Sequence, residues 1–385
     1  EHIDIDHELI TIRHYLHAHP ERSFQEFDTS IYLTDQLKAH GIEILPNSME
    51  TGVVGLIQGE AGPGPRIGLR ADIDGLPIVE DSGLEFSSVN KGVMHGCGHD
   101  GHMTILLLLA RWIAKNRAHL HCNVVLLFQP GEEGWAGARR MIDDGALENP
   151  RVDCVYGLHL CPTVPKGRIG IRWDYLMAQT SDFEITVHGK SAHASTPQMG
   201  IDAIVVAAEL ITMVQTVITR DVDPHQDALL TLGKIQGGTS HNVIAEDVTI
   251  SGTLRVFSND LYRTLSHKIA ALMQGLETAT GAQIDIERKV RYPSVRNPRE
   301  LVEQFYAVLD SMDDAVLVEP VMAAEDFAEY QQERPGVFFF LGVQEPSGTA
   351  PLHSSHFDFD ERVLLTGVET FKRILEGGSS CTKKK

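Results

Sequence analysis

Residues 123–134 read NVVLLFQPGEEG and show the strand-to-turn pattern from which the fold can be predicted. The run NVVLLF at 123–128 is typical of a buried strand, and a turn with two adjacent glutamates follows it directly. A helical pattern precedes this strand at 102–116, whereas a helical pattern near 136–145 and a strand pattern at 152–158 follow it. Strands that alternate with helices of this length predict an α/β sheet with helices on both faces.

The same alternation extends toward both ends of the chain. Residues 8–40 contain two amphipathic helical patterns broken at His19-Pro20, and two β-rich runs follow, VVGLIQ at 53–58 and RIGLRA at 66–71. After Pro293 a helical and a strand pattern resume with LVEQFYAVLDSM and VFFFLG. We therefore expect one domain in two parts, residues 1–177 and 291–376, followed by a flexible tail at 377–385.

Between these two parts the rhythm of the sequence changes. The order of the predicted elements is β-α-β-β-α-β, which is the split βαβ pattern of a ferredoxin-like domain. We expect residues 178–290 to form such a domain, inserted into the first one. Its strand patterns are SDFEITVHG (181–189), ALLTLGKIQ (228–236), DVTISGTLRV (247–256) and AQIDIERKV (282–290), with helical patterns at 201–219 and 261–276.

Composition excludes several classes of partner. Lys and Arg number 33 against 53 Asp and Glu, and the net charge of -20 opposes binding to nucleic acid or to anionic membrane surfaces. The longest apolar run, at 105–110, is far shorter than the roughly 20 residues that span a bilayer. Five cysteines in a chain of 385 residues do not suggest a disulfide framework. We therefore expect a cytoplasmic protein with no membrane or nucleic-acid partner.

The segment MHGCGHDGHM at 94–103 is the most informative for chemistry. Cys97 and His99 stand on either side of Gly98, which allows the backbone to bend so that both side chains converge. Thiolate and imidazole ligands suit zinc and related divalent metals. A chance grouping of loop residues explains any one of these side chains, but it explains the whole cluster poorly.

A second segment, FQPGEEG at 128–134, places Glu132 and Glu133 just past the C-terminal end of the buried strand. Open α/β sheets have their ligand crevice at this edge. Adjacent carboxylates point in different directions, so one can bind metal while the other moves protons. A solvated turn is the alternative for this segment alone. Further candidates lie at other strand or loop ends, namely Asp72, Asp74, His159, His353 and His356.

Together these segments resemble the metallopeptidase family of aminoacylases, hippurate hydrolases, indole-acetyl-amino-acid hydrolases and carboxypeptidase G, above all its amidohydrolase branch. The resemblance covers essentially the whole chain and implies a mixed-sheet zinc-peptidase-like catalytic domain with an inserted ferredoxin-like lid and dimerisation domain. The motifs that carry it are HAHPE (17–21), RADIDGLP (70–77), MHGCGHDGH (94–102), QPGEEG (129–134), GLH (157–159), GKSAHAS (189–195), SHNVI (240–244), GTLR (252–255), AEDF (324–327) and LHSSHFDFDE (352–361).

The resemblance implies a site for one or two divalent metal ions, with zinc expected first and manganese, cobalt and nickel as alternatives. Glu132 matches the general base of the family, and Asp74 matches an aspartate that orients the site, with Asp72 in support. His353 matches the last ligand because it directly follows Leu352, whereas His356 does not. The implied metal ligands are Cys97, His99, Glu133, His159 and His353.

Three residues of the inserted domain also match functional positions of the family. His193 matches a histidine that completes the active site, in several relatives from across a dimer interface. Asn242 and Arg255 match residues that hold the carbonyl or carboxylate of the substrate. The resemblance thus implies hydrolysis of small N-acyl-L-amino acids by metal-activated water, in a homodimer formed through the inserted domain. Gly96 and Gly131 stand where alanine is common in the family, which leaves the substrate open.

Other functions remain as alternatives at this point. Cys97 could be a nucleophile activated by His99 or His95, although this leaves the glutamate pair and the distant histidines unexplained. The chain could act as a carboxypeptidase or dipeptidase on small peptides. The chain could also be a non-catalytic small-molecule binding protein on the same scaffold. Such a protein would be expected to lack the base or a ligand, whereas this sequence retains Glu132 and all five implied ligands. The acyl group stays open among acetyl, benzoyl, longer acyl and auxin-like groups, and N-acetyl-diaminopimelate is a further possible substrate.

Overall fold

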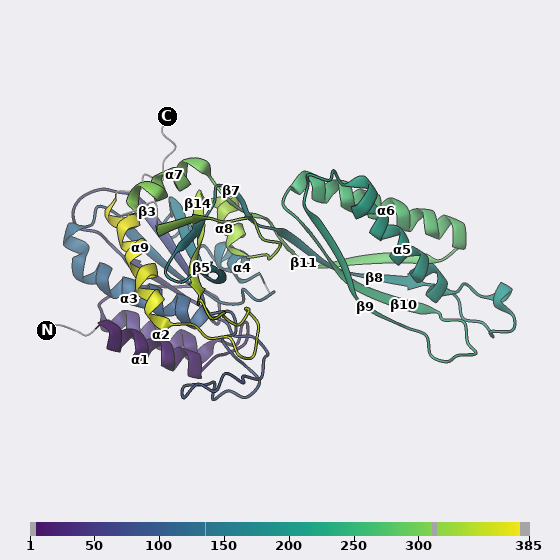
Figure 1. Ribbon diagram of the computed structural model, residues 1–385, viewed down its shortest axis with the longest axis horizontal. Helices are drawn as coiled ribbons and strands as arrows, with labels where there is room; N and C mark the ends of the chain where they lie inside the picture. Colours follow the sequence, from purple (N-terminus) through teal and green to yellow (C-terminus); the bar gives the residue numbers. More distant parts are fainter. Residues whose placement is uncertain (1–4, 135, 310–313, 378–385) are drawn as a thin grey trace. The chain divides into compact units, whose positions relative to one another are not determined.

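The computed structural model describes residues 5–134, 136–309 and 314–377, and these fall into two compact units (Figure 1). The first unit contains the described residues up to Leu176, those from 295 to 320, and those from Asp326 onward. The second contains residues 177–294 and 321–325. The protein is therefore a mixed α/β protein with an inserted domain. Residues 378–385 of the predicted tail lie outside the described part of the chain.

The described part of the first unit is built on a mixed sheet with the strand order β1-β2-β4-β3-β5-β14-β6-β13. Strand β3 runs parallel to both β4 and β5, and β5 runs parallel to β14. Three pairs are antiparallel: β1 with β2, β2 with β4, and β6 with β14. The strands are β1 (Glu43–Leu45), β2 (Val53–Ile57), β3 (Arg66–Asp72), β4 (Asn123–Gln129), β5 (Cys154–Pro165), β6 (Ile169–Ile171), β13 (Ala315–Leu317) and β14 (Gly336–Gln344).

Helices cover both faces of this sheet, as the alternating pattern predicts. Successive residues of a strand face opposite sides, and on β5 Leu158 joins the core that contains α3, whereas Gly157 faces Phe327 of α8. Helix α3 is buried along nearly its whole apolar run, because it packs between β3 and the helices α1 and α9. The helices are α1 (Ile5–Ala18), α2 (Phe27–Ala39), α3 (His99–Asn116), α4 (Gly137–Asp143), α7 (Arg299–Val308), α8 (Phe327–Glu333) and α9 (Leu364–Glu376).

The second unit has the predicted ferredoxin-like fold. Its antiparallel sheet has the order β11-β8-β10-β9, so the first and third strands are central and the second and fourth are edges. Both helices pack on this sheet and close a separate apolar core around Val187, Ile250 and Leu265. The elements are β8 (Gln179–His188), α5 (Ala203–Asp221), β9 (Ala228–Gly237), β10 (Asp247–Val256), α6 (Asn259–Thr280) and β11 (Gln283–Tyr292).

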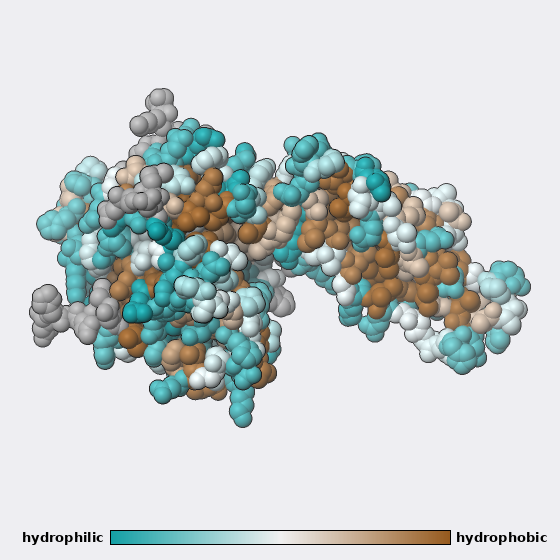
Figure 2. Space-filling model, in the orientation of Figure 1, coloured by the Kyte–Doolittle hydropathy of each residue, from teal (hydrophilic) through white to brown (hydrophobic). Residues whose placement is uncertain are grey.

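The second unit also exposes apolar side chains. Among the described helices, α5 alone has the length and apolar composition that would also suit a membrane span. One side of α5 packs into the core of the unit, while Ile204 and Val205 are about half exposed at 49% and 52%. The edge strand β9 exposes Leu229 and Ile235 as well. Hydrophobic surface gathers over this unit in Figure 2.

Candidate active site

The predicted site residues of the first unit converge where parallel strands end. Strand β3 ends at Asp72, which pairs in register with Gln129 at the end of β4. The turns that follow carry Asp74 after β3 and the glutamate pair after β4. Helix α3 begins at His99, two residues after Cys97, and β5 carries His159. Because β3, β4 and β5 run parallel and Arg70 of β3 is level with Gly157 of β5, the carboxyl ends of β3 and β4 lie beside His159 in the middle of β5.

All five predicted metal ligands lie in groups whose ligand atoms are within 4.8 Å of one another. The Sγ atom of Cys97 is 3.4 Å from Nε2 of His159, and Oε1 of Glu133 is 3.5 Å from Nε2 of His353. Segments up to about 250 residues apart in sequence thus meet around Cys97 and Glu133. Three of these groups are Cys97 with His99 and His159, Cys97 with Glu133 and His353, and His99 with Glu132 and Glu133.

The orientation of these side chains fits a divalent cation. His99 has its Nδ1 2.8 Å from the backbone carbonyl oxygen of Asp74, and His159 has its Nδ1 2.7 Å from that of Leu160. Each contact assigns the ring proton to Nδ1 and leaves Nε2 as the ligand atom. Within the described part of the chain, the buried His99 Nε2 and Glu133 Oε1 have no hydrogen-bond partner. Thiolate, imidazole and carboxylate donors of this kind suit zinc and its neighbours.

The negative charge of the carboxylates around His99 and Cys97 also favours a bound cation. Burial lowers the pKa of His99, but the carboxylates of Asp72, Asp74 and Glu133 outweigh it and raise this pKa to about 10, so a cation that binds Nε2 has to displace a second ring proton. Burial and the neighbouring carboxylates of Glu133, Glu132 and Asp72 raise the pKa of the Cys97 thiol well above its usual range. A cysteine in this setting is a poor nucleophile, so the nucleophile hypothesis loses its support. A divalent cation would balance these carboxylates and keep Cys97 as a thiolate.

The turn that carries the two glutamates is fixed through its main chain. Asp74 accepts the backbone N–H groups of Glu132 at 3.2 Å and Glu133 at 3.1 Å, and it accepts the hydroxyl of Ser23 at 2.6 Å. From the opposite side, Glu26 accepts the backbone N–H of Gly131 at 3.0 Å. The turn therefore directs one carboxylate to the ligand set and holds Glu132 beside it, as base catalysis requires.

With this geometry in place, comparison with known proteins identifies the family. The family model of peptidase family M20/M25/M40 matches residues 68–377. The chain belongs to this family. The resemblance predicted from the sequence motifs is therefore confirmed.

Relatives within the M20/M25/M40 family match nearly the whole chain. N-acetyl-L-cysteine deacetylase of Bacillus subtilis is 38% identical over 381 residues, which cover 97% of this chain and 89% of the relative. N-acetyldiaminopimelate deacetylase of Lactobacillus helveticus is 37% identical over 376 residues, covering 96% and 97%. Among solved structures, the Bacillus subtilis YxeP protein, a dinuclear metal-binding peptidase of the M20 family, matches with a TM-score of 0.84 and 33% identity, covering 97% of this chain and 98% of YxeP.

Beneath the candidate M20 metal site lies a buried network that sequence reasoning missed. The guanidinium of Arg70 donates to Asp72 at 2.8 Å, to Gln129 at 2.8 Å and to Asp326 at 2.9 Å, and all four side chains are fully buried. Burial raises the pKa of Asp72, but Arg70, His99 and His102 outweigh it and hold this pKa well below its usual range. Asp72 is therefore a carboxylate whose orientation is set by Arg70. The AEDF motif at 324–327, which contains Asp326, was the available signal for this network.

The other histidines of these motifs have surroundings that differ from those of the predicted ligands. His95 is buried and joins none of the candidate metal groups among the described residues. His102 contacts Asp72 and the backbone of Leu160. His356 is exposed and lies 3.4 Å from Asp81 at the surface, away from the ligand groups that contain His353. The structure thus places His353, and not His356, in a candidate ligand group among the described residues.

Two of the three predicted residues of the inserted domain lie side by side. His193 pairs with Val243 in a short bridge, and the N–H of Ala194 donates to the carbonyl of Asn242 at 3.1 Å. The exposed ring of His193 accepts the backbone N–H of Ser195 at 3.1 Å. Both loops leave the end of the sheet where Asp247 pairs with His188. This places His193 and Asn242 at one end of the inserted sheet.

Arg255 lies at the other end of that sheet. It pairs with Thr180, near the start of β8, and its Nη1 donates to the carbonyl of Met322 at 2.8 Å. Eight residues separate Asp247 from Arg255 along β10, which at about 3.3 Å per residue is about 26 Å. A single inserted domain therefore does not bring Arg255 together with His193 and Asn242.

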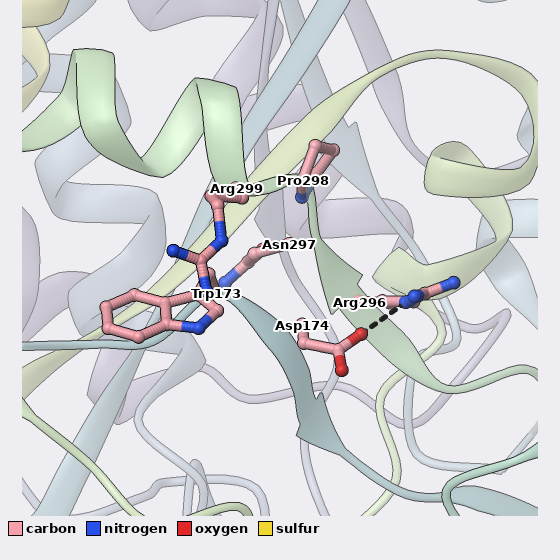
Figure 3. A pocket seen from close by; sticks show the side chains of 6 residues that line it. All are labelled: Trp173, Asp174, Arg296, Asn297, Pro298 and Arg299. Carbon is pink, nitrogen blue, oxygen red and sulfur yellow. Dashed lines mark hydrogen bonds and ion pairs between the residues drawn. The ribbon is translucent and has the colours of Figure 1, made fainter.

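A separate hollow of about 470 Å³ lies in the first unit and contains none of the predicted site residues (Figure 3). The guanidinium of Arg299 stacks 4.7 Å above the Trp173 ring, and Arg296 forms an ion pair with Asp174. These side chains already satisfy one another, so the hollow adds nothing to the chemistry above. It is lined by Trp173, Asp174, Arg296, Asn297, Pro298 and Arg299, around β7 (Asp174–Met177) and β12 (Val295–Asn297).

Proposed function

We propose that this protein is a metal-dependent amidohydrolase that removes the acyl group from small N-acyl-L-amino acids. One observation carries the proposal: five potential ligands gather around Cys97 and Glu133, with a second carboxylate, Glu132, held beside them. The names of the two deacetylases, each at least 37% identical over nearly the whole chain, support the substrate class.

The chemistry follows from the residues of the site. An amide is a poor electrophile with a poor leaving group, and a bound divalent cation would lower the pKa of water to about 7 and polarise the carbonyl. Glu132 accepts the proton of the attacking water and returns it to the departing amine. His193 stabilises the oxyanion, and Asn242 holds the substrate carbonyl. Arg255 pairs with the free carboxylate of the amino acid, as guanidinium geometry favours.

The metal that we propose first is zinc. A thiolate, three imidazoles and a carboxylate form a mixed set that zinc accepts readily. Manganese, cobalt and nickel accept the same donors, and availability in the cell decides among them. The overlapping groups around Cys97 and Glu133 support two ions rather than one.

We also propose that the protein works as a homodimer through the inserted domain. Two observations support this. His193 and Asn242 lie on loops at the Asp247 end of β10, and that strand end is about 26 Å from Arg255, so a second copy would supply them to a site that contains the first copy's Arg255. The half-exposed apolar side chains on α5 and the edge strand β9 offer a surface that a second copy could cover.

A substrate panel tests the proposed activity. Metal-stripped and metal-reloaded enzyme should be assayed with N-acetyl and N-benzoyl amino acids and with dipeptides. We expect hydrolysis of the acyl amino acids only after reloading. Faster turnover of the dipeptides would instead establish the peptidase alternative, and binding without turnover would establish the binding-protein alternative.

The variant Glu132→Gln tests the mechanism in the same assay. The amide side chain keeps the shape of the turn but cannot take up a proton, so kcat should fall by about 10²–10⁴-fold. Metal content and thermal stability should stay at the wild-type level. Glu60→Gln, at an exposed position, is the matched control and should keep full activity. Near-normal turnover in Glu132→Gln would remove Glu132 from the mechanism.

A further inference from the structure

His102 is a buried histidine of the metal-binding motif to which the mechanism above gives no role. We propose that His102 is a positioning residue. It hydrogen-bonds to Asp72 and Leu160, which contact the two metal ligands His99 and His159, and so fixes the positions of these ligands relative to each other. The proposal rests on the metal-dependent function above. It assigns to the third histidine of MHGCGHDGHM a task other than binding metal.

The position of His102 follows from the start of α3. His102 lies three residues after His99 on this helix, so both side chains project from the same face. Only 2% of His102 is exposed, and its ring lies between the end of β3 and the strand β5. Its centroid is 5.5 Å from that of His99 and 4.8 Å from that of His159.

Both nitrogens of His102 are occupied by hydrogen bonds. Nδ1 lies 2.6 Å from Oδ1 of Asp72, and because a carboxylate only accepts, Nδ1 is the donor. Nε2 accepts the backbone N–H of Leu160 at 3.0 Å. A cation therefore finds no lone pair on this ring, although Asp72, His99 and His102 lie close enough together to form a metal group.

The two hydrogen bonds of His102 connect it to the two ligands, through Leu160 to His159 and through Asp72 to His99. Leu160 gives its N–H to His102, while its carbonyl oxygen lies 2.7 Å from Nδ1 of His159, so the backbone of one residue, Leu160, connects both rings. On the other side, Asp72 receives His102 on Oδ1 and Arg70 on Oδ2, and this second oxygen faces Nε2 of His99 at 3.4 Å. His102 thereby sets the spacing between ligands that come from α3 and from β5.

Histidine suits this task because it must donate on one side and accept on the other. An asparagine amide reaches roughly the position of Nδ1 and a glutamine amide roughly that of Nε2, so each retains one of the two bonds. The variants His102→Asn and His102→Gln therefore separate the contact with Asp72 from the contact with Leu160. Partners of this kind typically change metal affinity by about 10–100-fold.

Cobalt(II) titration tests the proposal without any substrate. The absorption band of a thiolate bound to cobalt reports occupancy next to Cys97. We expect both variants to raise the Kd for cobalt about 10–100-fold, while His119→Asn, at an exposed position, keeps the wild-type value. Wild-type cobalt affinity in both His102 variants would overturn the proposal, even if their metal-free forms were less stable, because a purely structural role gives that result.

A measurement on the wild-type protein covers the case in which the variants do not fold. Protein labelled with ¹⁵N in histidine and loaded with ¹¹³Cd should show cadmium–nitrogen coupling at Nε2 of His99 and His159. His102 should show none and should keep its proton on Nδ1 with and without cadmium. Coupling at His102 would overturn the proposal. Neither measurement involves hydrolysis, so a protein that binds cobalt and cadmium as expected but cleaves no acyl amino acid would refute only the proposed function.

Discussion

Gly131, in the turn that carries Glu132, has a left-handed backbone with φ of +65°. A Cβ atom built there would lie 2.5 Å from Cζ of Phe24. The Phe24 ring is held in place by its contact with the guanidinium of Arg140, which lies 4.0 Å from the ring centroid. Phe24 is itself left-handed at φ of +60°, which is unusual for a bulky residue. The close packing of Phe24 and the left-handed backbone together explain why this chain has glycine at position 131.

Gly131→Ala should therefore destabilise the protein through both strain and contact. We expect the free energy of unfolding to fall by about 1–3 kcal/mol from overpacking, added to the cost of a left-handed alanine. Kcat should fall as well, because the turn positions Glu132. Urea denaturation at an unchanged m-value measures the stability.

Gly83→Ala supplies the matched control, since Gly83 is also left-handed, at φ of +74°, with nothing within 4 Å of the added Cβ. It measures the cost of the backbone conformation without the contact. Equal losses of stability in the two variants would contradict the importance of the Phe24 contact.

Residue chemistry alone could name the ligand-bearing segments, whereas the choice of His99 and His353 within them came only from the resemblance to the family. The segment at 94–103 contains His95, His99 and His102, and no local pattern tells which ring keeps a nitrogen for metal. That depends on hydrogen bonds to the backbone of Asp74, in the turn after β3, and of Leu160, on β5. Ser23 and Glu26 were missed for the same reason, because Ser23 donates to the distant carboxylate of Asp74 and Glu26 accepts the backbone N–H of the distant Gly131.

At the scale of elements, the first turn of α3 is anchored to α1 by buried charges. His17 lies 2.9 Å from Asp100 and 3.2 Å from Glu80, and Arg13 lies 3.3 Å from Asp100. Asp100 directly follows the ligand His99, so this network fixes the helix end on which the metal motif sits. Burial lowers the pKa of His17, but Asp100 and Glu80 outweigh it and raise this pKa to about 9.

This shift predicts a pH dependence of stability. The folded protein holds the His17 proton more tightly than the unfolded chain, so the stabilisation is complete below pH 6.5 and is lost as pH rises through about 9. Relative to His17→Gln, the free energy of unfolding should fall by about 1.4 kcal/mol per pH unit across this window. Urea denaturation at several pH values measures the difference. Parallel pH profiles of the two proteins would contradict a charged His17.

The elements themselves were predicted well wherever a pattern was long and regular. The inserted domain follows from its strand and helix periods because each element has one face on a single core. The amphipathic helix α9 was not predicted, although Phe371 and Ile374 complete the core of the first unit. Three-residue strands such as β6 and β13 are too short to show any period, and only their pairing with β14 and with each other defines them.

At the scale of the whole molecule, the positions of the inserted-domain residues make a prediction about subunit cooperation. Glu132→Gln and His193→Ala should each be inactive alone. If His193 acts on the site of the partner copy, a mixed dimer contains one site with both residues intact. Random exchange of equal amounts should then restore about a quarter of wild-type activity.

Mixing the two variants after subunit exchange, with light scattering to confirm the dimer, measures this complementation. The matched control mixes Glu132→Gln with wild type, which dilutes active sites without creating new ones. A mixture of the two inactive variants that stays inactive while exchanging subunits would contradict the action of His193 across the interface.

We propose that one or two divalent cations bind beside Glu132. Their ligands come from the start of α3 and the residues just before it, from β5, and from the segments that follow β4 and β14. Anomalous diffraction at the zinc edge, from crystals of zinc-loaded protein, tests it most directly. We expect one or two peaks within bonding distance of Cys97 Sγ, His99 Nε2 and Glu133 Oε1, with His159 and His353 completing the coordination. Zinc bound elsewhere, with these five side chains left uncoordinated, would contradict it.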